Sequence, residues 1–527
     1  MEYFLADTKE SLTLFDTFKL EHPQLQLLNH YAYPNFDHDR YIFNSNNFNQ
    51  YEIENIINFS SDWYHSKCGD VTLYNGFSWG PTLGSNMLLQ LPFLYKEYIA
   101  FKKLRFNIIW ISSNESLEFK KLMEYFYKDK VRFYQVATCP RLIDLYSKRS
   151  LQMPRKDFRF SFLALIKKIL LFKHPVTLFL AEGSLLSYFD KKEDVYYLNT
   201  KNIKKGIYQN APSSYTASLK FIPPWLTDSQ FYHKHFFRHN TEAQLNIDPD
   251  FLTFFAISTS QSIADKKTTL SAWISFYISL LENYSIKEIV FAGERIEYLS
   301  LGIEVANIYK AKKIHIIDGV AYGKRILYFY NKNFKSIFNF SITFNPESYA
   351  TLSKNNPVLD KIILEEQPHP MLLKTPAVKK SVYDVIVFAP ISLEYSISSL
   401  PDYSPITLDL LIKKLTAAGL KVAIKFKNVN IMQYYKDFLT DEIYQDIPSL
   451  TCTPSEAFSF TKAIVTGVST TIAEAEAHKT PCFVYEAYGS GYFKDFLSEE
   501  FFGRRTLYLN PDILTSEIKK ELTVKNF

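Results

Sequence analysis

The segment from Lys462 to Tyr485 constrains the fold more than any other stretch of this chain, because two strand patterns enclose one helical pattern. Ala463–Val465 is a short apolar run, and Pro481–Tyr485 is a second one. Between them, Ile472–His478 favours a helix. Parallel neighbouring strands need such a crossover connection, whereas antiparallel strands can be joined by a tight hairpin. The segment therefore predicts a βαβ unit and a fold of the α/β class.

The turn inside this unit, Thr466–Thr471, consists of small and hydroxyl residues and leads into the predicted helix. A helix N-terminus presents unpaired N–H groups and the positive end of the helix dipole, so it suits a phosphate group. An ordinary helix cap is the simpler alternative for the hydroxyls. Glu474 or Glu476, early in the helix, could bind a ribose hydroxyl. The residues that we expect at the phosphate are Gly467, Ser469, Thr470 and Thr471.

Strand and helix patterns alternate along the rest of the chain, which predicts two Rossmann-like domains facing a cleft. Predicted strands include residues 107–112, 131–136, 288–292, 313–317, 336–344, 383–390 and 421–426, and predicted helices include 117–127, 298–311 and 407–418. Turn residues such as Asn345-Pro346 separate two series of these units. The predicted organisation is an N-terminal acceptor-side domain over 1–345, a linker over 346–380, a C-terminal nucleotide-sugar-binding domain over 381–510 and a tail over 511–527.

Composition and missing motifs exclude several classes of protein. The 60 basic and 55 acidic residues among 527 give a net charge of +5, too small to indicate nucleic-acid binding. The four cysteines show no metal-ligand spacing, so we expect no metal and no cofactor. Residues 1–7 lack the basic start and apolar core of a signal peptide, which favours a cytoplasmic protein with reduced thiols. Walker, zinc-protease and G-x-S-x-G patterns are missing.

The most apolar stretch is Phe160–Ala181, which charged residues and Pro175 interrupt. This stretch is unsuited to crossing a bilayer, and we predict a buried helix followed by a strand over Val176–Leu180. Contact with a membrane surface through exposed lysines and aromatic residues stays open as an alternative.

Polar residues that follow predicted strands are candidates for chemistry. Glu294 and Asp318 each come just after a strand of the first domain, where a carboxylate could act as the general base for an acceptor hydroxyl. A solvated loop acid or a helix cap is the alternative for each. Lys425 ends a strand of the second domain and could hold a phosphate, unless it is an ordinary edge lysine. Asp70 precedes the glycine-rich stretch Gly76–Gly84, which could line an acceptor site or form a packed aromatic loop.

The stretch Thr466–Val484 resembles the donor-binding region of bacterial GT-B glycosyltransferases that make surface polysaccharide. The resemblance implies that Ser469, Thr470 and Thr471 hold the phosphate of the donor and that Glu474 lies near the ribose. Residues 317–323 are similar to a Gln-His-Gly loop of that family, with Asp318 in place of the histidine.

Among these families, the chain looks most like transferases that use CMP-activated acidic sugars. Such enzymes often carry a Lys-x-His-Pro motif, where this chain has Lys425-Phe-Lys-Asn428. The first hypothesis is therefore a glycosyltransferase that moves a sugar from a nucleotide-activated donor, CMP-sugar favoured, to a surface-glycan acceptor. A CDP-polyol phosphotransferase of similar fold is the second, and a non-catalytic nucleotide- or glycan-binding protein is the third.

Overall fold

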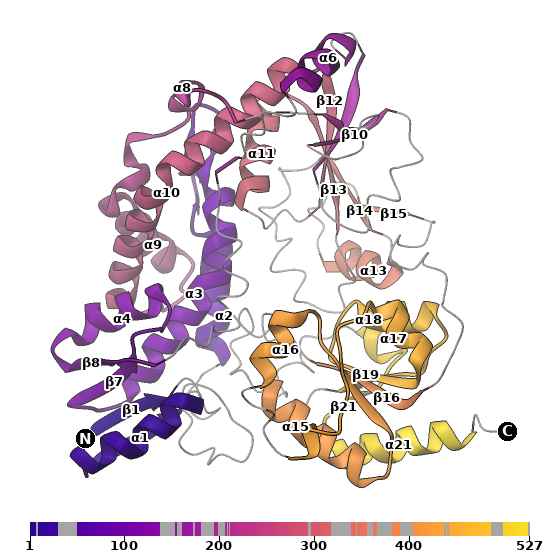
Figure 1. Cartoon of the computed structure of the whole chain (residues 1–527). Helices are drawn as coiled ribbons and strands as arrows, with labels where there is room; N and C mark the ends of the chain where they lie inside the picture. Colours follow the sequence, from indigo (N-terminus) through magenta and orange to yellow (C-terminus); the bar gives the residue numbers. More distant parts are fainter. Residues whose placement is uncertain are drawn as a thin grey trace. The chain divides into compact units, whose positions relative to one another are not determined.

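The computed structural model describes residues 1–6, 9–29, 50–136, 153–154, 161–171, 174–180, 194–198, 206–207, 209, 211–292, 297–317, 339–343, 345–355, 362–365, 382–389, 404–436, 439, 442–485 and 499–524. The chain divides into two compact units, each built from separate stretches (Figure 1). The first comprises residues 1–56, 89–148 and 374–527, and the second comprises residues 57–88 and 149–373. Parallel strands alternate with helices in both, which confirms the predicted α/β class.

The C-terminal part of the first unit is a six-stranded parallel sheet. Its strands are β16 (Tyr383–Phe388), β17 (Val422–Lys425), β18 (Ser449–Leu450), β19 (Thr461–Thr466), β20 (Cys482–Tyr485) and β21 (Leu507–Tyr508). They lie in the order β18-β17-β16-β19-β20-β21, so the chain winds outward from β16 on one side and then from β19 on the other. This is the doubly wound order of Rossmann folds, with its switch point between β16 and β19.

Helices cover both faces of this sheet: α15 (Ser404–Ala417), α16 (Val429–Lys436), α17 (Pro454–Phe460), α18 (Thr471–Ala477) and α21 (Pro511–Val524). Val385 and Val387 of β16 pack in one cluster with residues of α15 and α21. Ile386, on the opposite face, packs with Phe458 of α17 and Ala475 of α18. Side chains alternate between the faces of a strand, so both faces of β16 are buried, as expected for a parallel sheet.

The second unit contains a seven-stranded parallel sheet. Its strands are β9 (Val176–Leu180), β10 (Val195–Leu198), β11 (Gly206–Ile207), β12 (Ile286–Ala292), β13 (Lys312–Ile316), β14 (Phe340–Thr343) and β15 (Ile362–Leu364). The order β11-β10-β9-β12-β13-β14-β15 repeats the doubly wound pattern and adds one strand at the end. Two elements, α13 (Pro346–Asn355) and β15, fall inside the stretch predicted as a linker.

Helices of the second unit surround long α10 (Pro249–Asn283), which packs against α9 (Ser229–Glu242) and α11 (Glu297–Ile308). The described helix α6 (Ser161–Leu171) precedes β9. The strand predicted over Val176–Leu180 is confirmed. The burial predicted for the helix before it is wrong, because Leu165 and Ile169 of α6 are 55% and 69% exposed.

The N-terminal part of the first unit is a four-stranded parallel sheet in the order β2-β1-β7-β8. The strands are β1 (Glu2–Ala6), β2 (Leu25–Asn29), β7 (Ile108–Ser112) and β8 (Val131–Tyr134), with helices α1 (Lys9–Glu21) and α4 (Leu117–Tyr127). Helices α2 (Gln50–Asp62) and α3 (Trp79–Lys103) each have residues in both units. The predicted strands over 107–112 and 131–136 and the helix over 117–127 are confirmed.

Gly302 sets the approach of α11 to α10. A methyl group at Gly302 would lie 2.7 Å from Cζ of Tyr277, a side chain that is 1% exposed. The ring is held in a packed interior, so it cannot move aside without disturbing its neighbours. The absence of a side chain at Gly302 is therefore a packing requirement.

We predict that Gly302→Ala lowers the free energy of unfolding by about 1–3 kcal/mol, because the overpacking exceeds the gain of up to about 1 kcal/mol in helix propensity. Denaturant unfolding measures the change. In a Tyr277→Leu background, where the ring is removed, the same substitution should become neutral or stabilising. A loss of equal size in both backgrounds would show that the contact with Tyr277 is not the cause.

Candidate functional site

Three residues meet at the carboxyl edge of the six-stranded sheet. Lys425, the last residue of β17, pairs with Phe388, the last residue of β16. Val387 pairs with Val465 of β19, so Thr466 comes level with Phe388 on its other side. The edge between β16 and β19 is the switch point of the sheet, where open α/β sheets bind their ligands. The sheet thus brings two residues of the sequence prediction, Lys425 and the start of the 466–471 turn, to one place.

Lys425 is a buried cation at this edge, with 5% of its surface exposed. Its Nζ donates a hydrogen bond to the carbonyl of Phe426 at 3.2 Å and lies 5.2 Å from the ring centroid of Phe388. Burial lowers the pKa of Lys425, while the nearby Cys452 and Glu474 act in the opposite direction. A buried ammonium is stabilised by an anionic partner, so this edge of the sheet favours a negatively charged ligand.

The turn between β19 and α18 is open to solvent. Gly467, Ser469, Thr470 and Thr471 are all half-buried, so the predicted phosphate site is not sealed inside the core. Glu474, in the first turn of α18, is only 8% exposed.

Ser469 is the residue that organises this turn. Its Oγ accepts a hydrogen bond from the backbone N–H of Thr471 at 3.2 Å and lies 3.3 Å from Oγ1 of Thr466. Its carbonyl accepts from the N–H of Ile472 at 3.1 Å. Ser469 thus makes a local side-chain bond of the ST-turn kind just before the N-cap residue of α18, which is Thr470. Thr470, at the start of α18, makes no side-chain capping bond in the described part of the chain.

Cys452 follows β18 and is half-buried near Lys425. Burial raises the pKa of its thiol, and Lys425 lowers it by a smaller amount. The thiolate is the reactive form of cysteine, so a raised pKa argues against Cys452 as a nucleophile.

The two predicted catalytic carboxylates, Glu294 and Asp318, lie outside the described residues. The strands before them are described: β12 ends at Ala292 and β13 ends at Ile316. The switch point of the seven-stranded sheet lies between β9 and β12, and Glu294 comes two residues after the end of β12 in the sequence. Their catalytic roles stay predictions.

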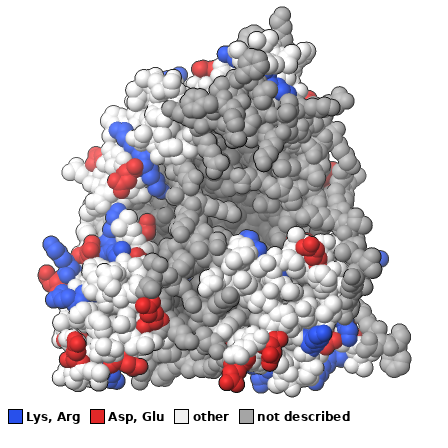
Figure 2. All heavy atoms as spheres, in the orientation of Figure 1, with Lys and Arg blue, Asp and Glu red and all other residues white. Residues whose placement is uncertain are grey.

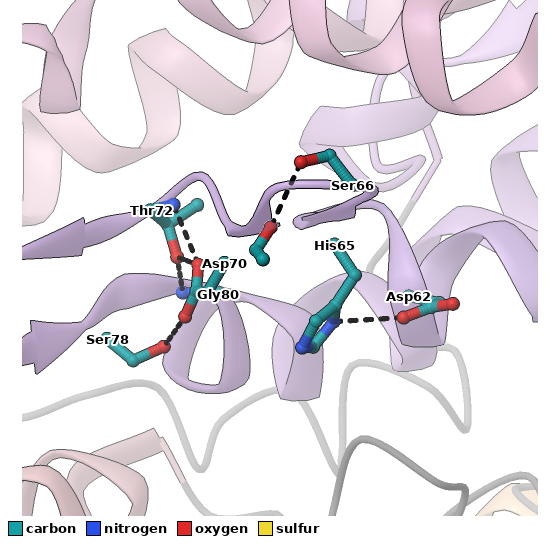
Figure 3. A network of polar contacts seen from close by, with 8 residues as sticks. Asp62, His65, Ser66, Asp70, Thr72, Ser78 and Gly80 are labelled. Carbon is teal, nitrogen blue, oxygen red and sulfur yellow. Dashed lines mark hydrogen bonds and ion pairs between the residues drawn. The ribbon is translucent and has the colours of Figure 1, made fainter. Parts of the chain in front are cut away.

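Asp70 organises a pair of short hairpins, β3 (His65–Ser66) with β4 (Gly69–Asp70) and β5 (Leu73–Tyr74) with β6 (Phe77–Ser78) (Figure 3). Its Oδ1 accepts bonds from the backbone N–H of Thr72 at 2.7 Å and from Oγ1 of Thr72 at 2.6 Å. The hydroxyl of Ser78 donates to Oδ2. These bonds occupy both carboxylate oxygens, which supports the packed-loop alternative for this stretch rather than an acceptor site.

Glu304 of α11 is a functional candidate that the sequence analysis missed. It is 3% exposed, and its Oε2 accepts a bond from the backbone N–H of Ser78 at 3.1 Å. Burial raises the pKa of Glu304 to about 7; hydrogen bonds from Ser78 and Asn307 oppose the shift. The negative charge of Asp70 also raises the pKa of Glu304, and the positive charge of Lys313 lowers it. The only available sequence signal was one acid between the apolar residues Ile303 and Val305.

We predict that Glu304→Gln flattens the pH dependence of stability. A carboxyl whose pKa rises on folding retains a proton that the unfolded chain releases, so the free energy of unfolding falls as pH rises from about 4.5 to about 7. The fall is at most about 3 kcal/mol. Denaturant unfolding of both proteins at pH 5 and pH 8 measures it. Asp265→Asn, at an exposed position of α10, should keep the slope of the unmodified chain. An unchanged slope in the glutamine variant would contradict the assignment.

The charges of the described residues are mixed on the face that Figure 2 draws. Over the face drawn in Figure 2, Lys and Arg side chains are interspersed with Asp and Glu side chains, without a continuous basic area among the described residues. Within the same residues, no group of three His, Cys, Asp or Glu side chains could hold a metal ion. No described helix is long and apolar enough to cross a bilayer.

No protein-family model matches the chain, and no curated protein matches it. Solved structures with a similar fold include UDP-N-acetylglucosamine 2-epimerase from Rickettsia bellii, with 13% identity, TM-score 0.32, and 60% of this chain and 78% of that chain covered. The wall teichoic acid polymerase TagF has 13% identity, TM-score 0.33, and 72% and 85% coverage. The calicheamicin glycosyltransferase CalG4 has 11% identity, TM-score 0.32, and 66% and 90% coverage. Such distant likenesses do not assign an activity to this chain.

Proposed function

We propose that this protein is a glycosyltransferase of the GT-B type that binds a nucleotide-activated sugar at the carboxyl edge of its six-stranded sheet. The observation that carries the proposal is the alignment of Lys425, Phe388 and Thr466 at the switch point between β16 and β19. The sequence resemblance of the 466–484 stretch to donor-binding regions supports it independently. The proposed reaction joins the sugar to a hydroxyl of a surface glycan in the cytoplasm.

In this proposal the site acts on the phosphate that leaves the sugar. The half-buried hydroxyls of Ser469 and Thr470, just before α18, donate hydrogen bonds to the phosphate oxygens. Lys425, at the same edge of the sheet, stabilises the negative charge that develops as the bond between sugar and phosphate breaks. Glu474 binds a ribose hydroxyl.

The acceptor hydroxyl then bonds to the sugar carbon, and Glu294 or Asp318 takes its proton. The departing group is a nucleotide, for which CMP is favoured by the resemblance.

We predict that Ser469→Ala combined with Thr470→Ala weakens nucleotide binding by at least about tenfold, because lost hydrogen bonds to a charged group contribute about 1.5–3 kcal/mol. Calorimetric titration with CMP, CDP, UDP and GDP measures the affinity, and turnover of the corresponding sugar donors measures KM. The donor KM should rise, while the free energy of unfolding should fall only by the loss of the local bond of Ser469, about 1 kcal/mol. Unchanged donor kinetics would remove the proposed phosphate site.

Lys425→Met tests the charge behind the site. Nucleotide affinity should fall about tenfold while the free energy of unfolding stays the same or rises, since burying an ammonium costs desolvation free energy. The matched control is Lys421→Met, at the exposed position just before the same strand, which should leave affinity unchanged. Equal affinities for both variants would contradict the role of Lys425.

Turnover of a CDP-polyol donor alone would favour the phosphotransferase over the glycosyltransferase, and binding of nucleotide without turnover of any donor would favour a binding protein.

A further inference from the structure

Helix α6 presents four large aliphatic side chains to solvent. Leu165, Ile166, Ile169 and Leu170 are 55%, 37%, 69% and 61% exposed. They occupy positions i, i+1, i+4 and i+5, so they form one continuous strip along the helix. Isolated exposed aliphatic residues are common, but a contiguous apolar strip is typical of a surface that binds another protein or a membrane.

The strip faces away from the rest of the second unit. Successive helical residues are rotated by about 100°, so the four side chains span an arc of about 140°. Leu171, which is 7% exposed, lies opposite the middle of this arc. Its burial shows that the other side of α6 is the one that packs on the protein.

The two lysines of α6 border the strip on either side and are directed back to the protein. Nζ of Lys168 donates to Oδ1 of Asn283, the last residue of α10, at 2.8 Å. Nζ of Lys167 lies 5.5 Å from the ring centroid of Tyr196 in β10. Figure 1 shows α6 beside the end of α10 and β10. The helix is thus fixed on one side and open on the other.

The charge of this region restricts what can cover the strip. Helix α6 contains two lysines and no acidic residue. A second copy of the chain would bring two positive regions together, which electrostatic repulsion opposes. An apolar surface with anionic groups at its boundary complements both the strip and its charge.

We propose that α6 binds to an anionic lipid bilayer surface, lying in the plane of the interface with Leu165, Ile166, Ile169 and Leu170 among the acyl chains. Amphipathic helices with basic residues beside an apolar face bind membranes in this way, through buried apolar area and attraction to anionic headgroups. The lysines border the apolar arc, so their positive charges lie beside the anionic headgroups while both side chains keep their contacts with the protein.

Cosedimentation of the full chain with vesicles tests the proposal. Vesicles of phosphatidylcholine with phosphatidylglycerol should bind the protein, whereas vesicles of phosphatidylcholine alone should bind it at least about tenfold more weakly, and raising the salt concentration should weaken binding to the anionic vesicles. The double variant Ile169→Gln, Leu170→Gln should bind anionic vesicles at least about tenfold more weakly, because two aliphatic side chains no longer enter the bilayer.

The matched control substitutes two equally exposed aliphatic residues of another helix. Ile513 and Val524 of α21 are 59% and 65% exposed, and Ile513→Gln with Val524→Gln should leave vesicle binding unchanged. Absence of binding to anionic vesicles, or equal loss in both double variants, would overturn the proposal. Sedimentation velocity without lipid adds a further test. A dimer that only the α6 variant abolishes would overturn the proposal, because it would show that a second copy of the chain covers the apolar strip.

Discussion

The parallel pairing of β16 with β19 is the interaction on which the C-terminal sheet and its site depend. It joins two segments separated by more of the chain than any other strand pair of that sheet, since β17 and β18 intervene in the sequence. Because the chain winds from β16 to β17 on one side and from β19 to β20 on the other, this pairing forms the switch point at which open α/β sheets bind ligands. The same pairing closes both cores, since Val465 contributes to one and Ile464 to the other.

The sequence was sufficient to predict helices and strands where the pattern of residues was local. The βαβ unit around residues 462–485 is confirmed as β19, α18 and β20, because apolar runs bounded by turn residues carry their own signature. Strand order was not predictable in this way. Periodicity says which residues form a strand but not which strand lies beside it, so the doubly wound order of the two larger sheets emerged only from the structure.

The candidate site was predictable in part for the same reason. Lys425 and the 466–471 turn were identified because each follows a strand, but their proximity depends on the register of β16 with its two neighbours. Glu304 was missed because an acid in a helix usually faces water, and its bond with Ser78 joins residues far apart in the sequence. The burial expected for α6 failed because apolar composition does not show whether a partner surface exists within the chain.

The two larger sheets repeat one winding scheme, and each has helices and a switch point of its own. A reaction between two substrates requires recognition of two unlike molecules. Separate sheets allow the loops of one to diversify without disturbing the strands that support the other. In the proposed glycosyltransferase, substitutions that change the specificity for the acceptor could then arise without changing the specificity for the donor.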